Sequence, residues 1–157
     1  MNLPNSFAPK RIGWRIRFWR ERFELTESFC WRIPDALQSL VLGAVEAEFF
    51  AVRRFDDGAW YFCGRKGGQW DGATGVPTTD CVVFASWVHD MLYGYVREIA
   101  KSWYGADTWR NRHRVRKVGD RFFRHILRDE GSWARTIYPL GVRLLGGVWN
   151  EMGLLFR

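Results

Sequence analysis

The turn-forming segment from Asp71 to Pro77 divides the sequence into two halves with different hydrophobic patterns, and this division most constrains the fold. In the first half, Phe23–Ile33 has the β-branched and aromatic character of a strand. Two further apolar stretches, about 47–55 and 59–64, flank the turn dipeptide Asp57-Gly58, and this pattern favours a β-hairpin. The first half therefore predicts a small antiparallel β region.

Two segments of the first half fit both helix and strand. Gly13–Phe18 alternates apolar and basic residues as a strand would, yet its apolar residues also fit a helical stripe. Leu40–Phe55 is apolar and contains Gly43, so taken alone it could form either element. Both segments stay ambiguous at this level.

The second half has the signals of helices. The segment Thr78–Asp80 offers N-cap oxygens before a helix over 81–93. A second helix is expected over 115–128, and Ser132 caps a third that is disturbed at Pro139. We therefore expect an α+β fold, with a small N-terminal antiparallel β region packed against three C-terminal helices.

Length and composition indicate one globular domain over 1–157, with 1–69 as the basic N-terminal segment and β region and 70–157 as the turn and helical part. Aromatic residues make up 17% of the chain, so we expect an aromatic-rich core. Residues 1–9 contain no apolar run of the signal-peptide type. The longest apolar run, 137–156, is interrupted by charges. We therefore expect no signal peptide and no transmembrane segment.

The three cysteines, Cys30, Cys63 and Cys81, are odd in number and lack CxxC spacing. This pattern does not indicate a zinc site, and it suits a reducing compartment better than an oxidising one. The expectation is a chain without a disulfide framework.

The formal net charge of +7 is concentrated in two segments. Residues 10–22 contain six basic residues against one acid, and residues 110–128 contain eight against Asp120 alone. Such patches are typical of proteins that bind nucleic acid, an anionic membrane surface or an acidic protein face, although basic helix faces also serve solubility. The residues expected to contact an anionic partner are Arg15, Arg17, Arg110, Arg112, Arg114 and Arg116.

A few polar residues in the second half could carry chemistry. On a helix, His89 lies on a largely apolar face with Tyr93 one turn later, whereas Asp90 points about 100° away. Asp120 is the single acid of its basic segment, and Asp71 precedes a tight turn. A histidine held by carboxylates suits general acid–base catalysis or metal ligation, so His89 and Asp120 could hold a divalent metal.

Each of these residues also has a structural explanation. His89 could be a hydrogen-bonded core histidine, Asp120 an ion-pair anchor among arginines, and Asp71 the cap of the following turn. The order of His89-Asp90 and a distant aspartate is similar to metal phosphohydrolases of the HD type. Those enzymes require another histidine upstream, and in this chain none precedes His89.

A second catalytic hypothesis concerns Cys81, at the start of the expected helix 81–93. A helix N-terminus lowers the pKa of a thiol, and His113 or His125 would have to act as its base. The nucleophile of cell-wall cysteine peptidases has a similar Asp-Cys context, but Ser-Gly usually follows it, where this chain has Val82-Val83.

Four short motifs occur in one order over residues 70–147. They are Asp71-Gly72-Ala73-Thr74 with Pro77, His89-Asp90-Met91-Leu92-Tyr93, Gly119-Asp120, and Ile137-Tyr138 with Gly141-Val142-Arg143 and Gly146. In this order they resemble a small phage- and prophage-associated family of unknown function, marked by DGAS-x-P and HDxLY motifs. The resemblance implies a phage origin, a compact α+β fold and one polar centre formed by Asp71, His89, Asp90, Tyr93 and Asp120.

The chain departs from that family between Tyr93 and Asp120, where the basic, aromatic stretch 103–116 lengthens the spacing. We expect this stretch to determine specificity. Two function classes follow. The first is a phage structural or accessory protein, in the virion or the host cytoplasm, that binds a virion protein, a host protein or nucleic acid. The alternative is a small hydrolase of cell-wall or phosphodiester bonds, with His89 as acid–base and the three aspartates as orienting groups or metal ligands.

Overall fold

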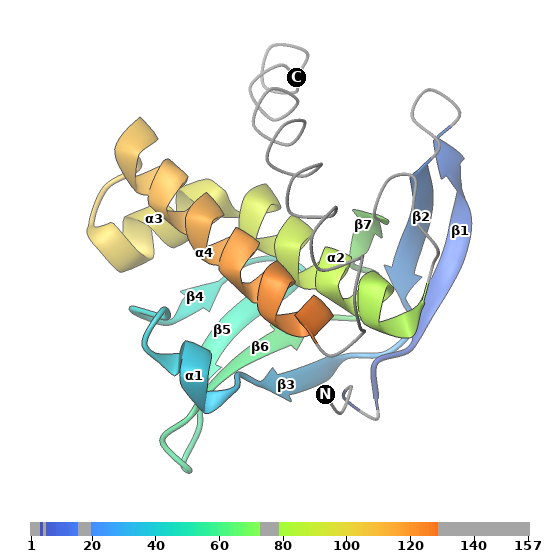
Figure 1. The fold of residues 1–157 in the computed structure, drawn as a ribbon, viewed down its shortest axis with the longest axis horizontal. Coiled ribbons are helices and arrows are strands. Elements are labelled where there is room, and N and C mark those ends of the chain that lie inside the picture. The colour runs from blue at the N-terminus through green and yellow to red at the C-terminus, as the bar shows by residue number, and fades with distance from the viewer. Residues whose placement is uncertain (1–3, 5, 16–19, 73–78, 129–157) are drawn as a thin grey trace.

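The computed structural model describes residues 4, 6–15, 20–72 and 79–128. The strands are β1 (Pro9–Arg15), β2 (Arg20–Leu25), β3 (Phe29–Arg32), β4 (Val45–Glu46), β5 (Phe50–Arg54), β6 (Trp60–Gly64) and β7 (Gln69–Asp71). The helices are α1 (Asp35–Gln38), α2 (Asp80–Gly94), α3 (Val96–Tyr104) and α4 (Trp109–Leu127). The strands come first, with one short helix among them, and the long helices follow, so the expected α+β fold is confirmed (Figure 1).

The strands form two antiparallel sheets. In the first sheet β2 lies between β1 and β7, and in the second the order is β3-β6-β5-β4. The prediction of one strand over 23–33 is wrong, because the chain turns at 26–28 and contributes β2 to one sheet and β3 to the other. The Thr26 hydroxyl stabilises the turn by donating a hydrogen bond to the carbonyl of Ala8 at 2.9 Å.

The predicted hairpin is confirmed as β5 and β6, which pair through the turn at Asp57-Gly58. Gly58 has a φ of 75°, in the left-handed region that favours glycine. The ambiguous stretch 40–55 contains β4 and β5, so its second half forms strands and not a helix. Of the other ambiguous segment, residues 13–15 belong to β1, and 16–18 lie outside the described residues.

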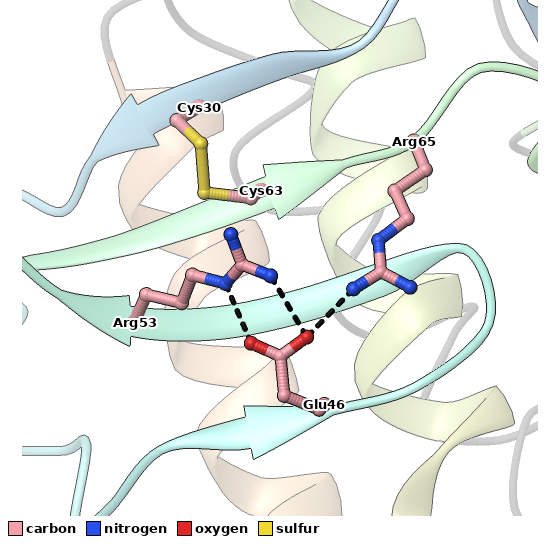
Figure 2. Close-up of a disulfide and its surroundings, with 5 residues drawn as sticks. All are labelled: Cys30, Glu46, Arg53, Cys63 and Arg65. Atoms are coloured by element: carbon pink, nitrogen blue, oxygen red, sulfur yellow. Dashed lines mark hydrogen bonds and ion pairs between the residues drawn. A yellow bond between two sulfur atoms is a disulfide. The ribbon is translucent and has the colours of Figure 1, made fainter.

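A disulfide joins Cys30 of β3 to Cys63 of β6, so the expectation of a chain without a disulfide framework is wrong (Figure 2). The two cysteines are direct partners in the antiparallel register, with Cα atoms 4.0 Å apart. Their separation of 33 residues carries no signal of that register, which depends on how the sheet assembles. The third cysteine, Cys81, keeps its thiol.

The second sheet has one face toward the core and one toward solvent. Along β3, Phe29 and Trp31 point inward, whereas Cys30 is exposed on the opposite face. Figure 2 also shows Glu46, from β4, paired with Arg53 and with Arg65, whose Nη2 lies 2.6 Å from Glu46 Oε2. This face is polar, so the helices cover the other one.

Helix α2 begins where the sequence predicts it, because the Thr79 hydroxyl accepts a hydrogen bond from the amide of Val82 at 3.3 Å. Helix α4 begins at Trp109, six residues before the predicted start at 115, because Thr108 caps it by accepting a hydrogen bond from the amide of Asn111. The first turns of α4, over 109–114, are therefore helical and not part of the preceding connection.

Helix α3 was not predicted; it ends at Tyr104, and Gly105 caps it with a φ of 76°. The predicted helix that begins at Ser132 lies outside the described residues. The described helices that follow the sheets are therefore α2, α3 and α4, a different set from the one expected.

The expected aromatic-rich core is confirmed between the second sheet and the helices that lie across it (Figure 1). The Trp87 ring of α2 lies 4.8 Å from that of Phe29 in β3, and the Phe122 ring of α4 lies 4.8 Å from that of Phe62 in β6. Gly64 makes this approach possible, since a Cβ there would lie 2.8 Å from the Trp87 ring. In the part of the chain that the structure describes, no helix is long and apolar enough to cross a membrane.

Candidate functional site

Four of the five predicted catalytic residues meet between α2 and α4. We call this group, made up of His89, Asp90, Tyr93 and Asp120, the polar centre. The rings of His89 and Tyr93 stack one turn apart on α2, with centroids 4.0 Å apart. The Tyr93 hydroxyl donates a hydrogen bond to Asp120 Oδ1 of α4 at 2.9 Å, and His89 Nε2 lies 3.6 Å from the same oxygen. The polar centre therefore joins the two helices.

The expectation that Asp90 faces away from His89 is wrong at the level of the side chain. The two backbone positions differ by about 100° around the helix. The Asp90 carboxylate nevertheless turns back, and its Oδ1 lies 3.1 Å from His89 Nδ1. The Asp90 side chain is 32% exposed against 10% for His89, so Asp90 lies at the rim of the polar centre.

The charge state of His89 follows from these contacts. Burial on its own lowers the pKa of His89, because an imidazolium loses its hydration. The hydrogen bonds and charges of Asp120 and Asp90 outweigh burial, so the pKa of His89 is raised above its usual value. Burial and the charge of Asp120 raise the pKa of Tyr93, which keeps its hydroxyl as a donor. The polar centre thus favours a cationic His89 between two carboxylates.

Close packing surrounds the polar centre. The Phe123 ring lies 5.5 Å from the His89 ring, and the Arg116 guanidinium lies over Tyr93 at 6.0 Å from the ring centroid. Gly119 lets the Tyr93 ring approach α4, since a Cβ there would lie 3.3 Å from the ring. Because both imidazole nitrogens face carboxylates, the arrangement suits an ion-paired link between helices.

Asp71 does not share the contacts that define the polar centre. It ends β7, where its backbone pairs with Arg22 of β2. Within the described residues, no group of three or more histidine, cysteine, aspartate or glutamate side chains is arranged to hold a metal ion. A metal at His89 and Asp120 would have to replace their ion pair.

The Cys81 thiol packs against the end of α4. It donates a hydrogen bond to the carbonyl oxygen of Ile126 at 3.4 Å. His113 lies roughly 20 Å from Ile126 along α4, too far to act as a base for this thiol. His113 instead stacks on Trp109, with the two ring planes 1° apart.

Six exposed basic residues follow one face of α4. Their spacing alternates between four and three residues, which places them within an arc of about 80° around the helix axis. We call this set the basic stripe, and it consists of Arg110, Arg114, Lys117, Arg121, Arg124 and the C-cap residue Arg128. Among the residues that the structure describes, no member of the basic stripe forms an ion pair.

The arginines expected to contact a partner divide according to their helical position. Arg110 and Arg114 belong to the basic stripe and are exposed. Arg112 turns toward Asp107, with its Nε 3.3 Å from Oδ1, and Arg116 is only 8% exposed. The structure therefore places Arg112 and Arg116 in contacts within the protein.

The remaining arginines expected to contact a partner belong to the basic segment of the N-terminal half. Arg11 pairs with Glu21 across β1 and β2 at 2.9 Å. Arg15 ends β1 opposite Arg20, and Arg17 lies outside the described residues.

The remaining members of the basic stripe were not predicted as binding residues, and neither was Trp109, which is 63% exposed. The spacing of the basic residues from Arg110 to Arg128 is the signal that could have found them. It becomes visible once the helix is known to begin at Trp109.

Comparisons with protein-family models, with curated proteins and with solved structures each found no significant match.

Proposed function

We propose that this chain is a phage-derived structural or accessory protein that binds an anionic partner through the basic stripe of α4. The observation that carries the proposal is the accumulation of six exposed cations on one helix face, with no ion pair among the described residues. Exposed cations that have no acidic partner among the described residues attract anionic groups and raise the rate of encounter with them.

The energetics of α4 support a binding role over a role in solubility alone. Like charges three or four residues apart destabilise a helix by about 0.2–0.5 kcal/mol per pair. The basic stripe contains such pairs along its whole length, for example Arg110 with Arg114 and Lys117 with Arg121. Solubility is served as well by interspersed acids, which would remove this cost.

The polar centre supports the same function by fixing α4. The contacts of Asp120 with His89 and Tyr93 hold the inner face of α4 against α2, so the basic stripe faces outward. Hydrolysis would require His89 to exchange a proton with a substrate. Both of its ring nitrogens face carboxylates, an arrangement that suits a structural role better than catalysis.

The phage origin in this proposal rests on the motif resemblance. The partner is a virion protein, a host protein or a nucleic acid, and the protein acts in the virion or the host cytoplasm. The disulfide between the exposed Cys30 and the buried Cys63 supports the virion, because disulfides persist in oxidising surroundings and are rare in reducing cytoplasm.

Retention on a heparin column, eluted with a salt gradient, tests the binding role. The triple variant Arg114→Gln, Lys117→Gln and Arg121→Gln removes three charges from the basic stripe. A matched control removes three exposed charges elsewhere, through Lys66→Gln, Arg97→Gln and Lys101→Gln. We expect the native chain and the control to elute together at high salt, and the stripe variant to elute clearly earlier. Co-elution of the stripe variant with the control would contradict the proposal.

A further inference from the structure

An aromatic pair borders the N-terminal end of the basic stripe. Trp109 is 63% exposed, and its ring lies parallel to that of His113 one turn later, with centroids 5.5 Å apart. Close by, the Arg114 guanidinium lies over the ring of Tyr104, 5.4 Å from its centroid. Flat rings and guanidinium groups are thus presented together at one edge of the protein.

This combination matches the chemistry of single-stranded nucleic acid. Its bases stack on exposed aromatic rings while its phosphates pair with nearby cations, whereas a duplex keeps its bases in its own stack. His113 covers one side of the Trp109 ring, and the exposure of Trp109 leaves much of the remainder to solvent. The basic stripe continues from this point for roughly 27 Å, with one cation about every 5 Å.

A membrane surface or an acidic protein would use only part of the surface formed by the basic stripe and Trp109. A helix that binds a membrane surface buries its apolar side in the lipid, but in α4 that side is already buried in the protein core at Val115, Phe122 and Ile126. An acidic protein would match the charge of the basic stripe, but it provides no base to stack on Trp109.

We infer that the basic stripe and Trp109 together bind single-stranded nucleic acid, with phosphates along the stripe and a base stacked on the indole ring. This inference rests on the proposed function, since it names the partner of the same surface. DNA and RNA share the chemistry involved.

Fluorescence anisotropy tests the inference. The labelled probes are oligo(dT) and oligo(rU) of about 20 nucleotides and a duplex of equal length, and polyglutamate serves as the competitor. We expect both single strands to bind more tightly than the duplex. The strand that binds more tightly shows whether the preferred ligand is DNA or RNA. The logarithm of affinity for oligo(dT) should fall with the logarithm of salt concentration with a slope of about −4, at about −0.7 for each phosphate contacted. The triple stripe variant should lower the magnitude of that slope by about 2.

The variant Trp109→Ala separates stacking from charge. It should weaken oligo(dT) binding at least about fivefold without changing the salt slope or the elution from heparin. Phe55→Ala removes another exposed aromatic ring, on the β5–β6 hairpin, and should leave binding unchanged. Equal binding by Trp109→Ala and the native chain, a preference for duplex, or displacement by polyglutamate as effective as that by unlabelled oligo(dT) would overturn the inference. Each of these results is compatible with the proposed function as long as the stripe variant still elutes early from heparin.

Discussion

Replacing Asp120 by asparagine should destabilise the protein in a pH-dependent manner. The change removes the charge that faces His89 at 3.6 Å, while the amide oxygen can still accept the hydrogen bond from Tyr93. Among the described residues, His89 then keeps Asp90 as its counter-charge, at 3.1 Å and at the more exposed rim. The substitution therefore isolates the ion pair from the shape of the site.

The magnitude follows from burial. Removing one partner of a buried ion pair costs about 3–5 kcal/mol when the other charge is left alone. The side chains of His89 and Asp120 are 10% and 14% exposed, and Asp90 still compensates part of the charge. We expect Asp120→Asn to lower the free energy of unfolding by about 2 kcal/mol at about pH 6.

The sign of the pH dependence follows from the raised pKa of His89 in the folded protein. The stability gained from protonated His89 is fully present below the pKa of the unfolded chain, about 6.5, and is lost as the pH rises through the folded-state pKa. The difference between the native chain and Asp120→Asn should therefore shrink as the pH rises above about 6.5.

Urea titration at several pH values, followed by tryptophan fluorescence and circular dichroism, measures both quantities. Glu98→Gln is the control, because it neutralises an exposed acid on α3 and should leave the pH dependence unchanged. Equal stability of Asp120→Asn and the native chain at about pH 6, or a difference that does not shrink as the pH rises above about 6.5, would contradict this prediction.

Two further predictions concern the sheets. Gly64→Ala should lower the free energy of unfolding by about 1–3 kcal/mol, measured by urea titration, because its Cβ would lie 2.6 Å from Leu25 and within 3 Å of two aromatic rings. Unchanged stability would contradict the packing around Gly64. The double variant Cys30→Ser and Cys63→Ser should lose about 3–4 kcal/mol, because the unfolded chain no longer has a closed loop. This double variant should be retained on heparin as strongly as the native chain. If a thiol reagent labels all the cysteines of the native chain in denaturant, the disulfide is contradicted.

Local signals predicted the elements that local chemistry determines. The hairpin was predicted because Asp57-Gly58 forms the turn itself. Helix α2 was predicted because Thr79 caps it directly. The first turns of α4 were missed because the stretch 103–116 was interpreted as a segment that lengthens the spacing between two motifs, although Thr108 carries the same kind of cap as Thr79.

Contacts between distant segments were harder to predict. Helical spacing placed His89 and Tyr93 on one face, and the motif resemblance added Asp120, but the return of the Asp90 side chain depends on its rotamer. The disulfide depends on the register of β3 and β6, which no local pattern reports. The charge of residues 110–128 was evident, yet only a known helix start separates exposed Arg114 from buried Arg116.

We infer that the outer face of α4 binds single-stranded nucleic acid. Photo-crosslinking of oligo(dT) that carries 4-thiothymidine, followed by mass spectrometry of the crosslinked peptides, locates the contact directly. We expect crosslinks concentrated in residues 109–128, and their loss at position 109 in Trp109→Ala. Crosslinks confined to the β region, under conditions where the oligonucleotide binds, would contradict it.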